Sequence, residues 1–105
     1  IFTKWGHKMY SCYDGNRIIA LLNKFQKKRE KIDLIFMDLV IPGGMGGKDA
    51  NKRVQELFPN QLVIVFSGYS EDPVLASPAK YGFCDYLVKP FSIKQLKKKC
   101  EKWLG

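Results

Sequence analysis

Four runs of apolar residues, each closed by residues that favour turns, predict four β-strands along the chain. They are His7 to Tyr13, Leu34 to Met37, Leu62 to Phe66 and Phe83 to Val88. The second and third runs are continuous instead of alternating with polar residues, which is typical of strands buried on both faces of a parallel sheet. The pattern therefore predicts a sheet whose central strands lead into Asp38 and Ser67.

Stretches with apolar residues at helical spacing follow these runs. Three of them predict regular helices, through Ile18, Ile19, Leu21, Leu22 and Phe25, through Ala50, Val54, Leu57 and Phe58, and through Ile93, Leu96, Cys100 and Trp103. The segment from Ser70 to Pro73 predicts another helix, with Ser70 as its cap. Because Pro78 interrupts this helix, we expect it to be short or kinked before Gly82 ends it.

The alternation of strands and helices, joined by connections of a few residues, predicts an α/β fold with a doubly wound parallel sheet. Strand-helix-strand units are right-handed and place helices on both faces of such a sheet. The chain has 105 residues, which suits a single domain over 1–105. The segment Ile1 to Gly6 is too short for an element of its own, and is predicted to be the last turn of one that begins earlier.

Composition and cysteine content indicate a globular protein of the cytoplasm. Hydrophobic residues make up 46% of the chain. No apolar run approaches the roughly 18 residues that a membrane span needs, and no segment has the zones of a signal peptide. Three cysteines, odd in number and far apart, favour reduced thiols in the core over a zinc site or a disulfide framework.

The net charge of +8 raises the question of nucleic-acid binding, because clustered lysines release counterions from phosphate backbones. The lysines gather mainly in two stretches, Lys24 to Lys31 and Lys94 to Lys102. No stacking aromatic residues interleave with them as they do in a nucleic-acid groove. We interpret both stretches as solvated helix faces and expect no specific nucleic-acid partner.

Three successive strands end in residues with reactive side chains, namely Asp38, Ser67 and Lys89. The carboxyl ends of parallel strands open on one edge of the sheet, so these groups are expected to converge in a shallow crevice. The set suits phosphoryl transfer, in which the aspartate accepts the phosphoryl group and the hydroxyl and ammonium bind its oxygens. A divalent cation normally offsets the crowded negative charge.

These residues and their surroundings resemble a response-regulator receiver domain of the CheY-like superfamily. The resemblance runs through Tyr13-Asp14-Gly15, Asp33 to Asp38, Ser67-Gly68 and Val88-Lys89-Pro90-Phe91. The loop Ile41 to Gly47 resembles that of receivers attached to hybrid sensor histidine kinases. The resemblance implies a flavodoxin-like, three-layer α/β/α fold with strand order 2-1-3-4-5.

The resemblance also implies roles for the side chains at the strand ends. Asp38 is similar to the phospho-acceptor, Ser67 to the switch hydroxyl and Lys89 to the lysine that contacts the phosphoryl group. The bond between Lys89 and Pro90 is implied to be cis. Tyr86 is similar to the aromatic residue that turns inward when the hydroxyl is drawn to the phosphoryl group.

Backbone groups have implied roles as well. The amides of Leu39 and Gly68 correspond to phosphoryl donors, and Asp38 with the carbonyl of Val40 corresponds to ligands of Mg²⁺. Receivers complete this metal site with an acidic pair at the end of their first strand, and the sequence from Ile1 onward lacks that strand. We therefore expect Mg²⁺ binding to be weak or absent in this chain.

The missing first strand would lie between His7–Tyr13 and the strand that ends at Asp38. Its absence would leave two unpaired edges at the centre of the sheet. We expect the chain to be an N-terminally incomplete receiver, or one whose gap is filled by a neighbouring segment or molecule. Asp14, which follows the His7 strand, is expected to cap a helix and not to replace the missing acids.

The leading hypothesis is a phospho-accepting receiver of a two-component signal transduction system. A sensor histidine kinase or phosphotransfer domain would supply the phosphoryl group. The last two helices and strand would form the output surface, where a homodimer is also expected. The protein would be a switch with self-catalysed transfer and autodephosphorylation, and not a metabolic enzyme.

Two alternatives remain open. A phosphatase with an aspartyl nucleophile needs a second aspartate two residues after the first, and the chain has Val40 there. A receiver-like interaction module that is not phosphorylated is favoured by the missing acids. It is favoured also by Pro78, in the helix that usually forms part of the output face.

Overall fold

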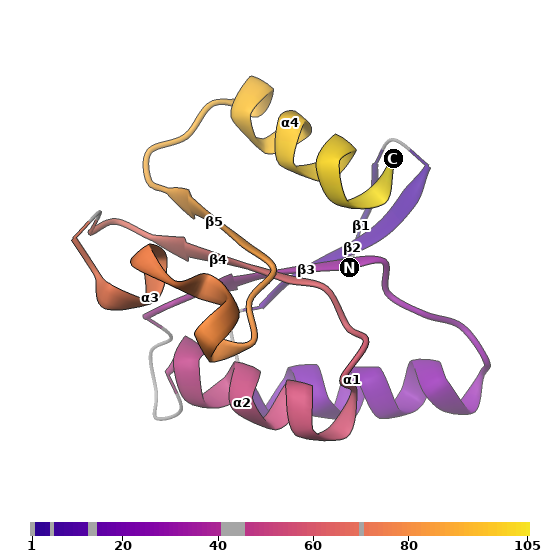
Figure 1. The fold of residues 1–105 in the computed structure, drawn as a ribbon. Coiled ribbons are helices and arrows are strands. Elements are labelled where there is room, and N and C mark those ends of the chain that lie inside the picture. Colours follow the sequence, from indigo (N-terminus) through magenta and orange to yellow (C-terminus); the bar gives the residue numbers. More distant parts are fainter. Residues whose placement is uncertain (1, 5, 13–14, 41–45, 70) are drawn as a thin grey trace.

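A five-stranded sheet with helices on both faces forms the body of the protein in the computed structural model (Figure 1). The structure describes residues 2–4, 6–12, 15–40, 46–69 and 71–105. In chain order the elements are β1 (Phe2–Lys4), β2 (His7–Cys12), α1 (Gly15–Lys27), β3 (Leu34–Asp38), α2 (Gly47–Leu57), β4 (Val63–Ser67), α3 (Pro73–Ala76), the 3-10 helix η1 (Pro78–Tyr81), β5 (Asp85–Val88) and α4 (Ile93–Leu104). The predicted α/β class is confirmed. Within the described residues, no helix is long and apolar enough to cross a membrane.

The strands lie in the order β1-β2-β3-β4-β5. The pairs from β2 to β5 are all parallel, as the alternation of strands and helices predicts. Helices α1 and α2 cover one face of the sheet and α4 covers the other (Figure 1). The carboxyl ends of β3, β4 and β5 therefore open on the same edge.

Direct pairing of β2 with β3 shows that the gap expected at the centre of the sheet is wrong. Met9 lies opposite Leu34 and Cys12 lies opposite Met37. Met9 and Cys12 are both buried, and they belong to the two hydrophobic clusters of the core. Pairing satisfies backbone groups that a gap would leave without partners. The four predicted strands keep their relative order, and no further strand lies between β2 and β3.

The segment before β2 also differs from the prediction, because Phe2–Lys4 is a strand and not a helical turn. It runs antiparallel to β2, with Phe2 opposite Met9 and Lys4 opposite His7. Gly6, between the two strands, has a φ of 81°, which glycine adopts without the clash of a side chain. A strand of three residues is too short to show a hydrophobic pattern in the sequence. It forms because it hydrogen-bonds to β2.

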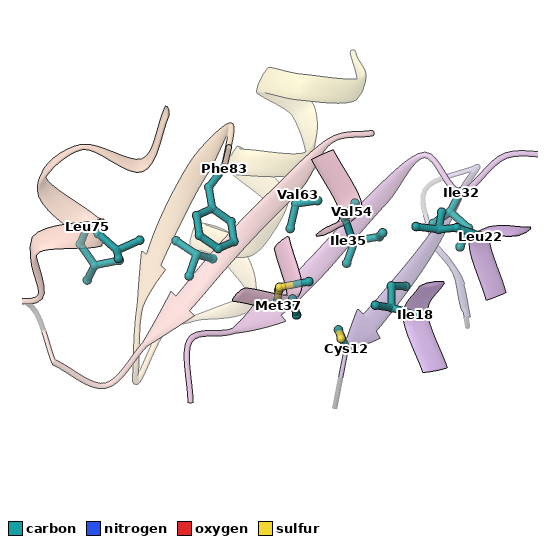
Figure 2. Packing of buried hydrophobic residues seen from close by; sticks show 13 residues of the cluster. Cys12, Ile18, Leu22, Ile32, Ile35, Met37, Val54, Val63, Leu75 and Phe83 are labelled. Atoms are coloured by element: carbon teal, nitrogen blue, oxygen red, sulfur yellow. The ribbon is translucent and has the colours of Figure 1, made fainter. Parts of the chain in front are cut away.

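Two hydrophobic clusters fill the spaces between the sheet and its helices. The cluster under α1, α2 and α3 consists of Cys12, Ile18, Leu22, Ile32, Ile35, Met37, Ala50, Val54, Val63, Val65, Val74, Leu75 and Phe83. Figure 2 shows these side chains gathered along the sheet, from Leu75 at one end to Leu22 and Ile32 at the other. The second cluster lies under α4 and includes Met9, Leu34, Phe36, Ile64, Leu87 and Cys100. β3 and β4 contribute to both clusters, as expected of strands buried on both faces.

The segment between β4 and β5 is short and broken, as predicted from its prolines. The side chain of Asp72 caps α3 by accepting the N–H of Val74 at 2.9 Å. The predicted cap, Ser70, lies outside the described residues. Pro78 starts the separate helix η1, and Gly82 ends it with a left-handed φ of 82°.

A buried amide joins η1 to α2. The Nδ2 of Asn51 donates to the carbonyl of Tyr81 at 2.9 Å, and its Oδ1 accepts the Nε2 of Gln55 at 3.3 Å. Gly82 lies beside this contact, and a Cβ on it would come within 2.6 Å of the Cγ of Gln55. The close approach and the positive φ both require glycine at this position.

All three cysteines are reduced thiols, as predicted. Cys12 and Cys100 lie in the core and Cys84 is half-buried. Burial, followed by the charge of neighbouring Asp85, raises the pKa of Cys84 to about 11.

Candidate functional site

Three adjacent strands deliver the predicted site residues to one edge of the sheet. Asp38 is the last residue of β3, Ser67 is the last of β4, and Lys89 directly follows β5. The pairing aligns these ends, because Asp38 lies opposite Phe66 and Ser67 lies opposite Val88. The convergence predicted from the order of strands is therefore present in the fold.

Asp38 and Lys89 form an ion pair at this edge. The Nζ of Lys89 donates to the Oδ2 of Asp38. The other carboxylate oxygen, Oδ1, accepts the backbone N–H of Val40 at 3.1 Å. Since 26% of the Asp38 side chain and 42% of the Lys89 side chain remain exposed, a reactant has access to the carboxylate.

Ser67 lies at the same edge but its hydroxyl is turned toward the loop after β4. It accepts the N–H of Tyr69 at 3.1 Å and donates to the carbonyl of Tyr69 at 3.3 Å. The carbonyl of Ser67 accepts the N–H of Lys89 at 2.8 Å, which connects the ends of β4 and β5. The side chain is buried, so its orientation depends on this loop.

An aromatic column fixes the segment that carries Lys89. The Lys89–Pro90 bond is cis, as predicted. The next residue, Phe91, packs against Phe66 with ring centroids 4.8 Å apart, and Phe66 stacks on Phe36 at 5.3 Å. Such pairs stabilise beyond the area they bury. The column joins β3, β4 and the segment after β5.

Helix α2 begins against the backbone of Asp38. The N–H of Gly47 donates to the carbonyl of Leu39 at 3.0 Å. A Cβ on Gly47 would lie 2.2 Å from the carbonyl oxygen of Asp38 and 2.8 Å from the Cα of Leu39. Only glycine permits this approach. The signal for this close approach in the sequence is the glycine-rich stretch that ends at Gly47.

The backbone amides of Leu39 and Val40, next to Asp38, both have hydrogen-bond partners in the structure. The N–H of Leu39 donates to the carbonyl of Phe66 at 2.9 Å and is therefore engaged in the sheet. The amide at the carboxylate is that of Val40, a residue predicted only as a carbonyl ligand. An aspartate whose side chain accepts the N–H two residues later forms a common turn, and this signal would have identified Val40.

Tyr86, the predicted switch aromatic, is in an outward orientation on β5. It is 39% exposed. The Nζ of Lys99 lies 4.9 Å from the centroid of its ring. Gly68, the other predicted amide donor, is exposed directly after β4.

The donors available for Mg²⁺ are few in the described part of the chain. No group of three or more His, Cys, Asp or Glu residues that could hold a metal ion occurs there. Asp38 offers one carboxylate, already paired with Lys89, and the Val40 carbonyl would add a second donor. Mg²⁺ favours six oxygen ligands, so water or a phosphoryl group would have to supply the others. Asp14 and residues 41–45 of the predicted loop lie outside the described residues.

Comparison with known proteins gives consistent matches along the chain. The family model of the response regulator receiver domain matches residues 1–101. Sporulation initiation phosphotransferase F of Bacillus subtilis is 27% identical over 104 residues, which cover 99% of this chain and 79% of that protein. Chemotaxis protein CheY of Thermotoga maritima is 32% identical over 91 residues, covering 87% of this chain and 72% of that protein.

A solved structure agrees in fold. A crystal structure of NtrX from Brucella abortus superimposes with a TM-score of 0.80 at 17% identity. The match covers 93% of this chain and 26% of that chain. At this identity the likeness concerns the fold alone, and this chain spans about a quarter of that protein.

Proposed function

Because the chain belongs to the family of response regulator receiver domains, we propose that Asp38 is its phospho-acceptor. Receiver domains are signalling modules of two-component systems and interact with histidine kinases or phosphotransfer proteins. The observation that carries the assignment to Asp38 is its ion pair with Lys89, formed between the ends of β3 and β5, the strands on either side of β4, on one accessible edge. No other acidic residue in the described part ends a central strand.

The proposed transfer uses the carboxylate as a nucleophile. A carboxylate oxygen of Asp38 attacks the phosphorus of a phosphohistidine, the phosphorus–nitrogen bond breaks, and the histidine leaves as the aspartyl phosphate forms. The ammonium of Lys89 leaves the carboxylate and binds the phosphoryl oxygens instead, where it neutralises part of their charge. Attack by water on the same phosphorus later restores the carboxylate and releases phosphate.

Hydrogen-bond donors around Asp38 support the transferred group. The Val40 N–H already points to the carboxylate, and Gly68 is an exposed residue directly after the next strand. The Ser67 hydroxyl would exchange its contacts with Tyr69 for a phosphoryl oxygen, and Tyr86 would then turn inward. The predicted contribution of the Leu39 amide requires that its bond to Phe66 opens first.

Mg²⁺ is the cofactor that receiver domains generally bind at this site. We propose that this chain binds it weakly or not at all, because one paired carboxylate and one carbonyl are the donors in the described part. Titration with MgCl₂, followed through the amide resonance of Val40, tests this proposal. Saturation at micromolar Mg²⁺ that is lost in Asp38→Asn would contradict it.

The partners proposed for this chain follow from the same role. A histidine kinase or phosphotransfer domain donates the phosphoryl group, and the surface of η1, β5 and α4 carries the output. A homodimer through that surface is a further proposal. Sedimentation velocity with and without a phosphoryl mimic tests it, since the mimic is expected to increase the dimer fraction.

Labelling with acetyl phosphate tests the central assignment. Intact mass spectrometry is expected to detect one added phosphoryl group, which hydroxylamine removes because it cleaves acyl phosphates. The group is expected to be absent from Asp38→Asn and present in the control Asp49→Asn, whose side chain is exposed on α2. Labelling of Asp38→Asn at the level of the unsubstituted protein would overturn the assignment.

A receiver-like module without phosphorylation remains the second candidate, favoured by the few metal donors near Asp38. Beryllofluoride separates the two functions, because it adds to a phospho-acceptor carboxylate as a phosphoryl mimic. Binding that shifts the amides of Val40 and Gly68 supports the receiver with a phospho-acceptor. Absence of binding with Mg²⁺ in large excess, together with absence of labelling, supports the module.

A further inference from the structure

A buried carboxylate lies on β5 next to Tyr86, outside the chemistry proposed for Asp38. The side chain of Asp85 is 7% exposed. Its Oδ1 accepts the Nζ of Lys99 at 2.8 Å, and its Oδ2 accepts the Nε1 of Trp103 at 2.9 Å. Lys102 adds a longer ion pair at 3.5 Å. Asp85 therefore connects β5 to the last two turns of α4.

Lys99 contacts Asp85 and Tyr86 with the same ammonium group. Its Nζ lies 2.8 Å from the carboxylate of Asp85 and 4.9 Å from the centroid of the Tyr86 ring. An ammonium at this distance from an aromatic ring is attracted to the ring face. Lys99 therefore links the ring of Tyr86 to the carboxylate of Asp85, which is held between β5 and α4.

The position of β5 explains how one lysine reaches both residues. Successive side chains of a strand point to opposite faces of the sheet, and burial alternates in this way along β5. Asp85 faces α4, whereas Tyr86 points away from it. Because β5 is an edge strand, the long side chain of Lys99 can extend past the edge to the tyrosine ring. Tyr86 and Lys99 both border an open groove of about 700 Å³ between β5 and α4.

The carboxylate of Asp85 is ionised at neutral pH. Burial acts to raise the pKa of Asp85, but the hydrogen bonds from Lys99 and Trp103 outweigh it, so the pKa lies below its ordinary value. A carboxylate that stays ionised holds the ammonium of Lys99 in place. The ammonium in turn has a fixed position from which to attract the ring of Tyr86.

We propose that Lys99 is a positioning residue that holds Tyr86 in its outward orientation. The inference rests on the proposed function, in which Tyr86 turns inward as the phosphoryl group is bound. Lys99 then opposes the switch and keeps the unphosphorylated state populated. Removing its charge shifts Tyr86 toward the inward orientation, so less rearrangement is left for phosphorylation to drive.

The test measures the solvent exposure of the Tyr86 ring in Lys99→Met, by photo-CIDNP of the unphosphorylated protein. The Tyr86 signal, identified by its loss in Tyr86→Phe, is expected to fall in Lys99→Met. Lys99→Arg is expected to restore it, since a guanidinium can contact both the carboxylate and the ring. Lys98→Met is the matched control, because Lys98 lines the same groove. The Tyr86 signal is expected to stay unchanged in this variant.

Phosphorylation gives the second readout. The rate of labelling by acetyl phosphate is expected to rise about two- to fivefold in Lys99→Met, the size of one partly exposed cation–π contact. Lys98→Met is expected to label at the unsubstituted rate. An unchanged Tyr86 signal in folded Lys99→Met overturns the inference, whatever the labelling shows.

The two proposals fail in different ways. Absence of labelling in the unsubstituted protein refutes the role of Asp38, whereas the ring measurement needs no phosphorylation. If Lys99→Met does not fold, Asp85→Asn/Lys99→Met replaces it, because this variant leaves no buried carboxylate without its lysine. The same fall in the Tyr86 signal is then expected, and its absence overturns the inference.

Discussion

The ammonium of Lys89 and the carboxylate of Asp38 form an ion pair across 51 positions of the chain. Both side chains are partly exposed, so solvent screens the pair and its contribution to stability is at most about 1 kcal/mol. The ion pair is important for the reaction because it places a cation beside the carboxylate oxygen that reacts. The pair is therefore expected to matter far more for phosphorylation than for folding.

Replacement of Lys89 tests this separation. Lys89→Met is expected to lower the rate of labelling by acetyl phosphate by roughly tenfold or more, because the phosphoryl oxygens lose a cation. The free energy of unfolding in urea is expected to change by less than about 1 kcal/mol. Lys94→Met, on an exposed position of α4, controls for loss of charge. Equal labelling of all three proteins would show that Lys89 does not contact the transferred group.

Gly47 is expected to tolerate no side chain. In Gly47→Ala the new Cβ would overlap the Asp38 carbonyl, since the distance to that oxygen would be 2.2 Å. We expect a loss of about 1–3 kcal/mol in the free energy of unfolding, as the start of α2 is pushed from β3. Gly46→Ala is the matched control, because its Cβ would meet its nearest neighbour at 3.8 Å. Equal stability of the two variants would contradict the close approach.

Asp85 is expected to make stability depend on pH. Its pKa is lowered in the folded protein, so its contribution is complete above the ordinary value of about 3.9 and is lost as the pH falls through the lower folded value. Asp85→Asn is expected to cost about 1–3 kcal/mol near pH 6. The difference from the unsubstituted protein should narrow below about pH 4. Urea unfolding at several pH values measures it, and a difference that widens on acidification would reverse the sign assigned here.

Asn51 is expected to hold α2 and η1 together. Asn51→Ala leaves the partly buried carbonyl of Tyr81 without its donor, which should cost about 1–3 kcal/mol of stability. Amide hydrogen exchange should rise in residues 78–82 more than in α4. Lys52→Ala, at the neighbouring exposed position, should leave both quantities unchanged. A uniform rise in exchange across the molecule would assign Asn51 to general stability instead.

The sequence predicted the parts of the site that follow from local pattern. Asp38 and Ser67 each end an apolar run and Lys89 follows one, so the parallel order of strands brings them to one edge. The broken helix before β5 was predictable too, because Pro78 and Gly82 act on their own neighbours. These features depend on short stretches and on the topology that they imply.

Other features depend on contacts between distant residues, and the sequence could not reveal them. The pairing of β1 with β2, and of β2 with β3, is decided by which strands bury their backbone groups best. The bond from Lys99 to Asp85 joins residues 14 positions apart, and either side chain alone is typical of an exposed surface. The engagement of the Leu39 amide by Phe66 likewise appears only once β3 and β4 are aligned.

The ring of Phe66 lies between Phe36 and Phe91, and this column has a spectroscopic consequence. Aromatic rings shift the resonances of protons above and below them by their ring currents, with a steep dependence on distance. The chemical shifts of the Phe66 protons therefore report the position of the segment after Lys89. A displacement of Phe91 when Lys89 engages a phosphoryl group would be recorded there in a proton spectrum, without any label or substitution.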